Sequence, residues 1–177
     1  MKLAILRIEA ADSAVVSVIL QRLSEAFPQI ECILLNGIMP VPEDAYNQVR
    51  RQYNSTQILT GMADSVGKAG ADIVLGVTQV DLYASGLNFV FGEAQCPGKL
   101  ALVSFFRLRP EFYGELPDKK RFFERTIKEA VHEVGHALGL RHCPDSFCVM
   151  FFQIRFSTRM PRGLCSAESA RARLQNA

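Results

Sequence analysis

Two kinds of hydrophobic spacing alternate along the first half of the chain. Short, almost wholly apolar runs at residues 3–8, 30–35 and 72–77 have the length and composition of β-strands. Between them, over residues 13–27 and 55–70, apolar side chains recur three and four positions apart, which is the spacing of one face of an α-helix. This β-α-β-α-β order predicts parallel strands with helices packed on the faces of a sheet.

The second half of the chain predicts two further strands and one long helix. The strands lie at residues 88–91 and 100–106, on either side of Gly92 and the turn sequence Pro97-Gly98. A helix follows at about 118–140, and its apolar residues recur on one face. That apolar stripe consists of Phe123, Ile127, Ala130, Val134 and Leu138.

Two segments lack a clear hydrophobic period. Residues 37–54 are polar and contain two prolines, so we expect a loop there, with a helical turn at 45–51. Beyond His142 the chain is irregular, and a short helix is expected near Ser166.

The predicted fold is a single α/β domain that spans residues 1–177. It should contain a mixed, mainly parallel sheet of about five strands flanked by helices, all within residues 1–139. Residues 140–177 should form a small subdomain that carries cysteines, with a cleft between the two parts.

Composition and charge exclude several classes of protein. A chain of 177 residues with 49% hydrophobic and 21% charged residues is typical of a globular domain that buries its own core. The net charge of +2 lacks the basic block of a nucleic-acid-binding protein, and the arginines at 155, 159 and 162 fit a solvated surface. No run approaches the ~18 apolar residues that cross a bilayer.

The N-terminal sequence indicates an intracellular, cytoplasmic protein. Arg7 and Glu9 interrupt the first apolar run before it reaches the length of a signal peptide. The first strand begins so early that no pro-segment is expected. In a reducing compartment, the five cysteines favour metal ligation over disulfide pairing.

The three histidines of the chain form the strongest chemical signal. His132 and His136 lie one helical turn apart, so both imidazoles project from the same face of the long helix. This spacing suits two nitrogen ligands of one tetrahedral Zn²⁺. Gly139 can end the helix in a left-handed conformation, which lets His142 return to the same ion.

Three histidine ligands would leave the fourth zinc position open for water, as in a catalytic site. Glu133 is one residue round the helix from His132, where it is placed to act as a general base and not as a ligand. A structural zinc with a fourth protein ligand, and a surface salt-bridge pattern without metal, are the alternatives at this point.

Three later cysteines suggest a second metal. Cys143 and Cys148 are separated by four residues, and a loop of this length can hold a soft ion between two thiolates; Cys165 follows further on. Cys32 and Cys96 are expected to be small buried apolar residues.

The sequence from His132 to Met150 resembles the metzincin zinc peptidases. The pattern His-Glu-x-x-His-x-x-Gly-x-x-His is followed by a methionine, and the immediate Cys143 with Cys148-Val-Met150 resembles the archaemetzincin branch. The resemblance implies a zinc-dependent metalloprotease, some relatives being aminopeptidases, with a second zinc bound by four cysteines. It also implies that Met150, rather than Met160, lies beneath the catalytic zinc and that residues 88–94 form the substrate-binding edge strand.

Two departures from the archaemetzincin pattern affect these expectations. Glu168 stands where a second cysteine would follow Cys165, so the fourth ligand of the second zinc is open: Glu168 could ligate it or instead stabilise a helix N-terminus. No tyrosine occurs after Tyr113, and Phe151 and Phe152 follow the methionine. Stabilisation of an oxyanion must then come from zinc or from another group.

The sequence therefore predicts a zinc metallopeptidase in which Glu133 activates a water on zinc, acting on peptides and binding neither nucleic acid nor membrane. Aminopeptidase action on small peptides is the narrower form that the resemblance implies. A zinc-binding structural or interaction protein with little turnover is the main alternative, and a hydrolase of non-peptide amides is a third.

Overall fold

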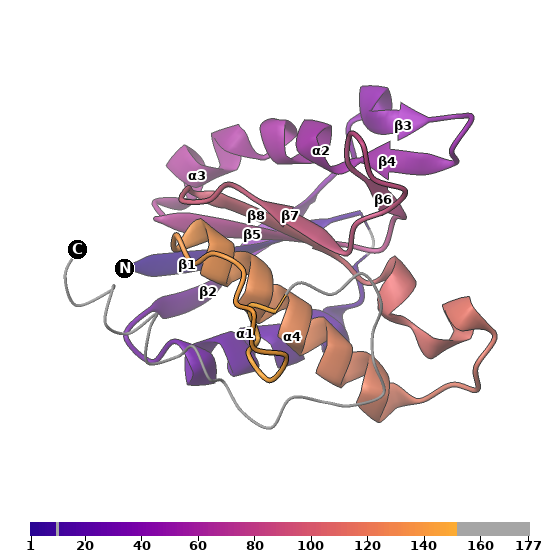
Figure 1. The fold of residues 1–177 in the computed structure, drawn as a ribbon. Coiled ribbons are helices and arrows are strands. Elements are labelled where there is room, and N and C mark those ends of the chain that lie inside the picture. Colours follow the sequence, from indigo (N-terminus) through magenta and orange to yellow (C-terminus); the bar gives the residue numbers. More distant parts are fainter. Residues whose placement is uncertain (10, 152–177) are drawn as a thin grey trace.

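A five-stranded sheet forms the centre of the molecule. The structure, a computed structural model, describes residues 1–9 and 11–151. The strand order is β2-β1-β5-β8-β7, in which β7 alone runs antiparallel to its neighbour (Figure 1). These strands are β1 (Lys2–Ile8), β2 (Glu31–Met39), β5 (Ile73–Thr78), β7 (Gly92–Ala94) and β8 (Leu100–Ser104). The predicted mixed, mainly parallel α/β sheet is confirmed.

Helices cover both faces of the sheet. On one face lie α1 (Ser13–Ala26) and α4 (Lys119–Ala137), and on the other lie α2 (Ser55–Gly61) and α3 (Ala63–Ala69) (Figure 1). Every residue of β5 and β8 is buried, which explains why these strands are continuous apolar runs and do not alternate with polar residues. Two hydrophobic clusters result, one on each side of the sheet.

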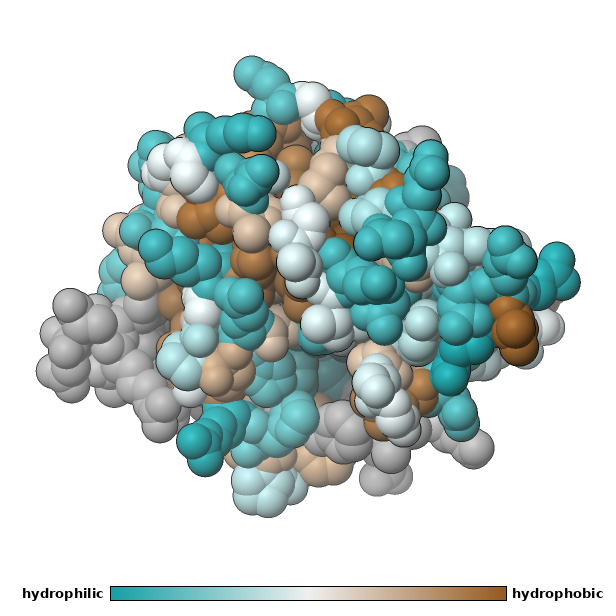
Figure 2. Space-filling model, turned by 90° about the horizontal axis from the view of Figure 1, so that it is seen from above, coloured by the Kyte–Doolittle hydropathy of each residue, from teal (hydrophilic) through white to brown (hydrophobic). Residues whose placement is uncertain are grey.

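The outer face over α2 and α3 carries mainly hydrophilic side chains, with hydrophobic ones scattered between them (Figure 2). None of the helices in residues 1–9 and 11–151 is long and apolar enough to cross a membrane.

A small second sheet replaces the loop predicted for residues 37–54. Strand β2 continues to Met39. In place of the helical turn expected at 45–51, a 3₁₀ turn, η1 (Glu43–Ala45), ends at residue 45 and an antiparallel hairpin follows, made of β3 (Tyr46–Asn47), a turn at 48–51 and β4 (Gln52–Asn54). A contact between distant segments explains this difference. Strand β4 also pairs with β6 (Leu82–Tyr83), which follows β5 in the chain. The remaining small elements are the 3₁₀ turns η2 (Phe106–Leu108) and η3 (Pro110–Tyr113).

The helix predicted for residues 55–70 is present as two short helices that meet at Met62. Its end at Gly70 is confirmed by a φ of 55°. The N-cap is Asn54, whose side chain accepts a hydrogen bond from the Gln57 backbone N–H at 3.0 Å. The Ser55 hydroxyl oxygen lies within hydrogen-bond distance of both the Tyr83 carbonyl oxygen and the Glu93 carboxylate.

The edge strand is shifted from its predicted position. Residues 88–91 form no regular strand, and Val90 makes only an isolated bridge to Leu82; the strand proper is Gly92–Ala94. The aromatic residues that suggested a strand, Phe89 and Phe91, stack edge to face at 5.3 Å and line a cleft instead. These residues are therefore apolar because they line the cleft, and not because they pair with a neighbouring strand.

Helix α4 has the predicted position, with Asp118 as its N-cap. It ends at Ala137, and Gly139 follows with φ of 87°. The Gly139 N–H donates to the His136 carbonyl oxygen and the Leu140 N–H to that of Gly135, which satisfies the last turn. The predicted subdomain 140–177 stays a prediction, since the expected helix near Ser166 lies outside the described residues.

Close packing of β7 against α4 requires a glycine at position 92. A Cβ placed on Gly92 would lie 2.5 Å from the Leu102 carbonyl oxygen and 2.6 Å from Cγ of Glu133. One of these contacts is to backbone of the neighbouring strand, which cannot move without disturbing the sheet. The missing side chain at Gly92 is therefore what lets the edge strand and the Glu133 side chain share this space.

We predict that Gly92→Ala lowers the free energy of unfolding by about 1–3 kcal/mol, the usual cost of overpacking. Urea unfolding followed by circular dichroism measures it. Gly67→Ala is the matched control: it lies within α3 with no atom within 4 Å of the added Cβ, so it should be neutral or stabilising by up to ~1 kcal/mol. Equal midpoints for wild type and Gly92→Ala would contradict the packing argument.

Candidate metal centre

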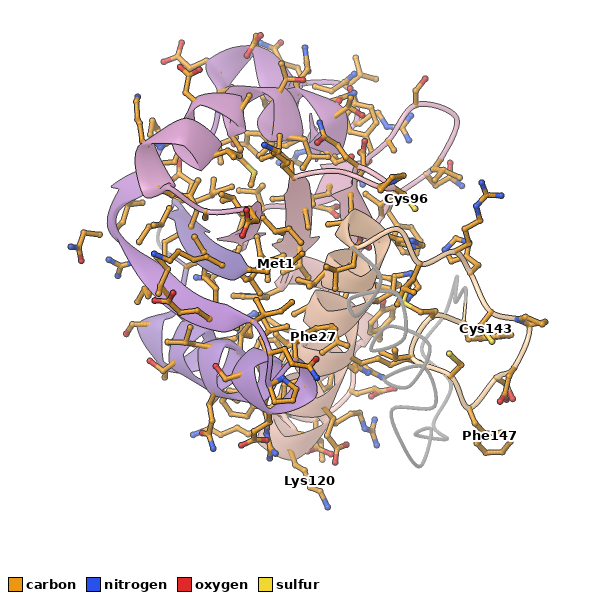
Figure 3. The ribbon with its side chains drawn as sticks, turned by 90° about the vertical axis from the view of Figure 1, so that its left-hand side faces the viewer. Met1, Phe27, Cys96, Lys120, Cys143 and Phe147 are labelled. Carbon is orange, nitrogen blue, oxygen red and sulfur yellow. The ribbon has the colours of Figure 1, made fainter. Side chains whose placement is uncertain are left out.

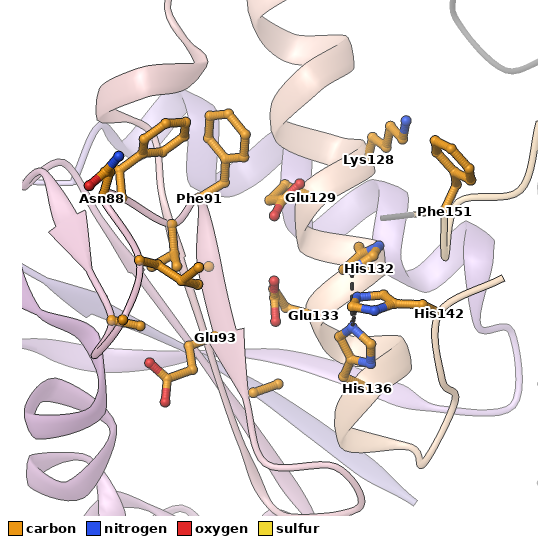
Figure 4. A pocket seen from close by; sticks show the side chains of 17 residues that line it. Asn88, Phe91, Glu93, Lys128, Glu129, His132, Glu133, His136, His142 and Phe151 are labelled. Carbon is orange, nitrogen blue, oxygen red and sulfur yellow. Dashed lines mark hydrogen bonds between the residues drawn. The ribbon is translucent and has the colours of Figure 1, made fainter. Parts of the chain in front are cut away.

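Three histidine nitrogens converge beside the C-terminal end of α4. His132 and His136 come from consecutive turns of the helix, and His142 comes from the segment after Gly139 (Figure 4). Nε2 of His136 lies 3.0 Å from Nε2 of His132 and 3.2 Å from Nε2 of His142. Among the described residues, these three alone form a group able to hold a metal ion.

Backbone carbonyls fix which nitrogen of two of these rings carries the proton. Nδ1 of His132 lies 2.8 Å from the Val149 carbonyl oxygen, and Nδ1 of His136 lies 2.8 Å from that of Leu140. A carbonyl oxygen only accepts, so each Nδ1–H donates and each Nε2 presents a lone pair. Such second contacts are typical of metal-binding histidines.

The Nε2 atoms are positioned to bind a cation and not to form hydrogen bonds with one another. Two lone pairs 3.0 Å apart repel, so they form no hydrogen bond. Zinc–nitrogen bonds of 2.0–2.1 Å in a tetrahedron place neighbouring nitrogens about 3.4 Å apart. The two separations are close to this value and all three ligand nitrogens lie within 4.8 Å of one another, so the three rings can hold a zinc ion between them.

Burial keeps the two helix histidines in the form that binds metal. Desolvation lowers the pKa of His132 to about 4, and it also lowers the pKa of His136. Because a metal ligand must be deprotonated, both rings are ready to bind zinc at neutral pH without first releasing a proton.

Glu133 lies beside the histidines but faces the sheet. Its side chain is buried between α4 and β7, and its carboxylate is not part of the nitrogen cluster (Figure 4). Burial, together with the neighbouring Glu129, raises the pKa of the Glu133 carboxyl well above its ordinary value.

Met150 packs against α4 at Gly135, between His132 and His136. A Cβ on Gly135 would lie 2.6 Å from Sδ of Met150, so the absence of a side chain there admits the methionine. The Met150 carbonyl oxygen accepts from the Cys143 N–H at 2.9 Å, which closes the loop of residues 143–150. Met160, the competing methionine, lies outside the described residues.

The cysteines do not all lie where the sequence suggested. Cys148 is buried and its Sγ accepts from the Met150 N–H, whereas Cys143 lies half-buried on the outer loop (Figure 3). Cys165 and Glu168 lie outside the described residues. The expectation that Cys96 is buried is wrong: it is exposed on a separate turn, where its Sγ contacts the Leu140 carbonyl oxygen at 3.5 Å. Tight turns place small residues at the surface whatever their hydrophobicity.

The histidines lie in the wall of a cleft of about 460 Å³. One wall is formed by residues 86–94, which lead into β7, and the other by α4 with His142 and Phe151 (Figure 4). Sequence reasoning missed three charged residues of this lining, namely Glu93, Lys128 and Glu129. Glu129 could have been found, since it lies four residues before Glu133 and thus on the same helix face.

Comparisons with known proteins agree on one family. The sequence profile of peptidase family M54 matches residues 38–159. The archaemetzincin of Methanocaldococcus jannaschii is 51% identical over 136 residues, which cover 76% of this chain and 73% of that protein.

Two solved structures resemble the whole fold. The crystal structure of archaemetzincin from Archaeoglobus fulgidus in complex with malonate has a TM-score of 0.80 and 39% identity, covering 96% of this chain and 99% of that chain. The archaemetzincin structure from Methanopyrus kandleri has a TM-score of 0.78 and 36% identity, covering 99% of this chain and 96% of that chain.

We predict that His136→Ala contains one zinc ion fewer per chain than the wild type after dialysis, because two imidazoles alone hold zinc weakly. Elemental analysis measures the loss. Glu133→Gln should keep the wild-type zinc content, since its side chain faces the sheet and not the nitrogen cluster. Undiminished zinc in His136→Ala would show that the ion binds elsewhere.

Proposed function

The chain belongs to peptidase family M54, the archaemetzincins, and on that premise we propose that it hydrolyses peptide bonds with Glu133 as general base. Family membership and the three-histidine site make it a zinc metallopeptidase. The observation that carries the proposal is the convergence of three Nε2 lone pairs in the wall of a cleft, with one buried carboxyl group beside them.

His132, His136 and His142 would hold the zinc and leave one ligand position facing the cleft. The bound ion would lower the pKa of a water molecule and polarise the peptide carbonyl. Glu133 would accept the water proton on its carboxylate and donate it to the leaving amine.

The shape of the cleft supports an extended peptide as substrate. Strand β7 is the last strand of the sheet and pairs with β8 on one side only. Its residues form one wall of the cleft, and α4 forms the other wall. An exposed strand edge can bind a peptide through backbone hydrogen bonds. Apolar side chains near it suit apolar substrate residues; they are Leu87, Phe89, Val90, Phe91 and Phe151.

Aminopeptidase action on small peptides is the narrower form of this proposal. Glu93 lines the same cleft and adds negative charge beside Glu133, which favours a substrate with a positively charged α-amino group. A cytoplasmic location belongs to the proposal too, as the N-terminal sequence suggests.

One observation favours the alternative of a zinc-binding protein with little turnover. The sequence contains no tyrosine after Tyr113, so no phenol follows Met150 to stabilise an oxyanion. Loss of one such donor costs about 2.7–4 kcal/mol where it has been measured. A measurement of turnover separates the two functions.

We predict that the wild type cleaves members of a peptide library and that Glu133→Gln does so at least ~100-fold more slowly, because the general base is lost. Mass spectrometry of the products measures cleavage, and products shortened by one N-terminal residue would indicate aminopeptidase action. If both proteins contain zinc and both are inert, peptide hydrolysis is excluded.

The cysteines add a second zinc to the proposal. Cys143 and Cys148 lie on one loop, and Cys165 follows later in the chain. Thiolates at such spacing suit a structural zinc, with Glu168 or another group as the fourth ligand.

We predict two zinc ions per wild-type chain and one in Cys143→Ser, because a hydroxyl is a far weaker zinc ligand than a thiolate. Elemental analysis counts them. Cys32→Ser, at a half-buried cysteine of β2, is the matched control and should keep both. A single zinc in the wild type would refute the cysteine site.

A further inference from the structure

One wall of the cleft begins with an irregular segment that is not part of a sheet ladder. This wall segment, residues 84–89, connects β6 to the isolated bridge at Val90 and contains neither helix nor strand. All of its residues except Ser85 line the cleft, and Figure 4 shows Asn88 on the side opposite α4. The position of these residues therefore depends on contacts from outside the segment.

An arginine from a distant turn binds two carbonyl oxygens of the wall segment. Arg50 lies in the turn between β3 and β4, and its Nη2 donates to the Leu87 carbonyl oxygen at 2.7 Å. The same nitrogen lies 3.3 Å from the carbonyl oxygen of Asn88. Hydrogen bonds from a charged donor are shorter and stronger than those between neutral groups. One side chain thus fixes two consecutive peptide groups of the cleft wall.

The Arg50 side chain is itself oriented by the small sheet. Its Nε donates to Oε1 of Gln52 at 3.3 Å, and its guanidinium carbon lies 4.5 Å from the centre of the Tyr83 ring. The Arg50 backbone N–H donates to Oδ1 of Asn47 at 3.0 Å. Strands β3, β4 and β6, which lie together at one end of the molecule (Figure 1), therefore present a preorganised guanidinium to the wall segment.

The aromatic ring at the end of the wall segment has a separate support. The guanidinium carbon of Arg107 lies 4.4 Å from the centre of the Phe89 ring, and Arg107 also binds both carboxylate oxygens of Asp81, at 2.5 and 2.7 Å. Arg50 consequently fixes the part of the wall before Phe89. The large apolar side chain of that part is Leu87, which lines the cleft and is 48% exposed.

Arg50 contacts the substrate wall and not the metal centre. The zinc-binding histidines and Glu133 lie on α4 and on the turn that follows it, whereas the Arg50 contacts lie in the small sheet and the wall segment. A change at Arg50 should therefore weaken substrate and transition state binding equally. Such a change raises KM and leaves kcat unaltered.

We propose that Arg50 is a positioning residue for substrate binding, which holds Leu87 in place as an apolar contact for the substrate by binding the carbonyl oxygens of Leu87 and Asn88. This inference rests on the proposed peptidase function. Arg50 acts through the wall segment and takes no part in the proton transfers.

Substitutions at Arg50 test the proposal by their effect on KM. Arg50→Gln removes the charge and is too short to reach the wall, so KM for a cleaved library peptide should rise about 3- to 10-fold. Its kcat should stay within about twofold of wild type, and its zinc content should be unchanged. Arg50→Lys keeps a charged donor and should restore at least half of the loss on a logarithmic scale. Arg51→Gln, the next residue of the same exposed turn, removes the same charge and should keep the wild-type KM.

A double-mutant cycle with Leu87 separates positioning from a general effect of charge. Leu87→Ala should raise KM by itself, and adding Arg50→Gln to it should raise KM less than twofold further, because no apolar side chain is left to position. Effects that multiply fully would overturn the proposal. An unchanged KM in Arg50→Gln would overturn it as well.

Hydrogen–deuterium exchange tests the wall segment independently of activity. The Leu87 N–H, which donates to the Ala84 carbonyl oxygen at 3.1 Å, should exchange faster in Arg50→Gln, while α4 exchanges as in the wild type. Faster exchange throughout the sheet would show a merely structural role and overturn the proposal. An inert wild type with this local change would refute the peptidase function but keep the support of the wall, whereas an active wild type without it would refute the role of Arg50 alone.

Discussion

At Gly139 the backbone adopts a φ of 87°, and the metal centre depends on this reversal. A helix that continued would carry the chain away from the first two histidines, since each residue advances it by about 1.5 Å. The left-handed residue ends the helix and returns His142 to within 3.2 Å of the His136 ring nitrogen. The same turn directs the Leu140 carbonyl oxygen at Nδ1 of His136, so it both brings in the third ligand and orients the second.

The opposite wall of the cleft depends on another missing side chain. Because Gly92 has no Cβ, the edge strand approaches α4 until its backbone lies against the Glu133 side chain. Gly135 does the same for Met150 beneath the histidines. The two glycines let the Glu133 carboxyl group and the Met150 sulfur pack closely beside α4. The site is therefore held by close packing against backbone rather than by mobile side chains.

Three carboxyl groups line the cleft beside the three histidines. Glu129 and Glu133 lie one turn apart on α4, while Glu93 accepts hydrogen bonds from hydroxyls of α2. The charge of a bound zinc ion would balance this negative potential, and its removal would leave several acidic groups close together. Metal binding and the protonation of these carboxyl groups would therefore be coupled.

The sequence by itself determined the parallel strands, the long helix, and the three histidines with Gly139. Each of these is a local pattern, in which spacing along the chain fixes direction in space. Only the tertiary structure decided the features that depend on contacts between distant segments. Strand β4 pairs with β6 where a loop was expected, and the apolar residues 88–91 line a cleft. The pairing of β7 with β8 and the contact of Gly92 with Glu133 join residues far apart in the sequence, and hydrophobic periodicity carries no information about which distant elements will meet.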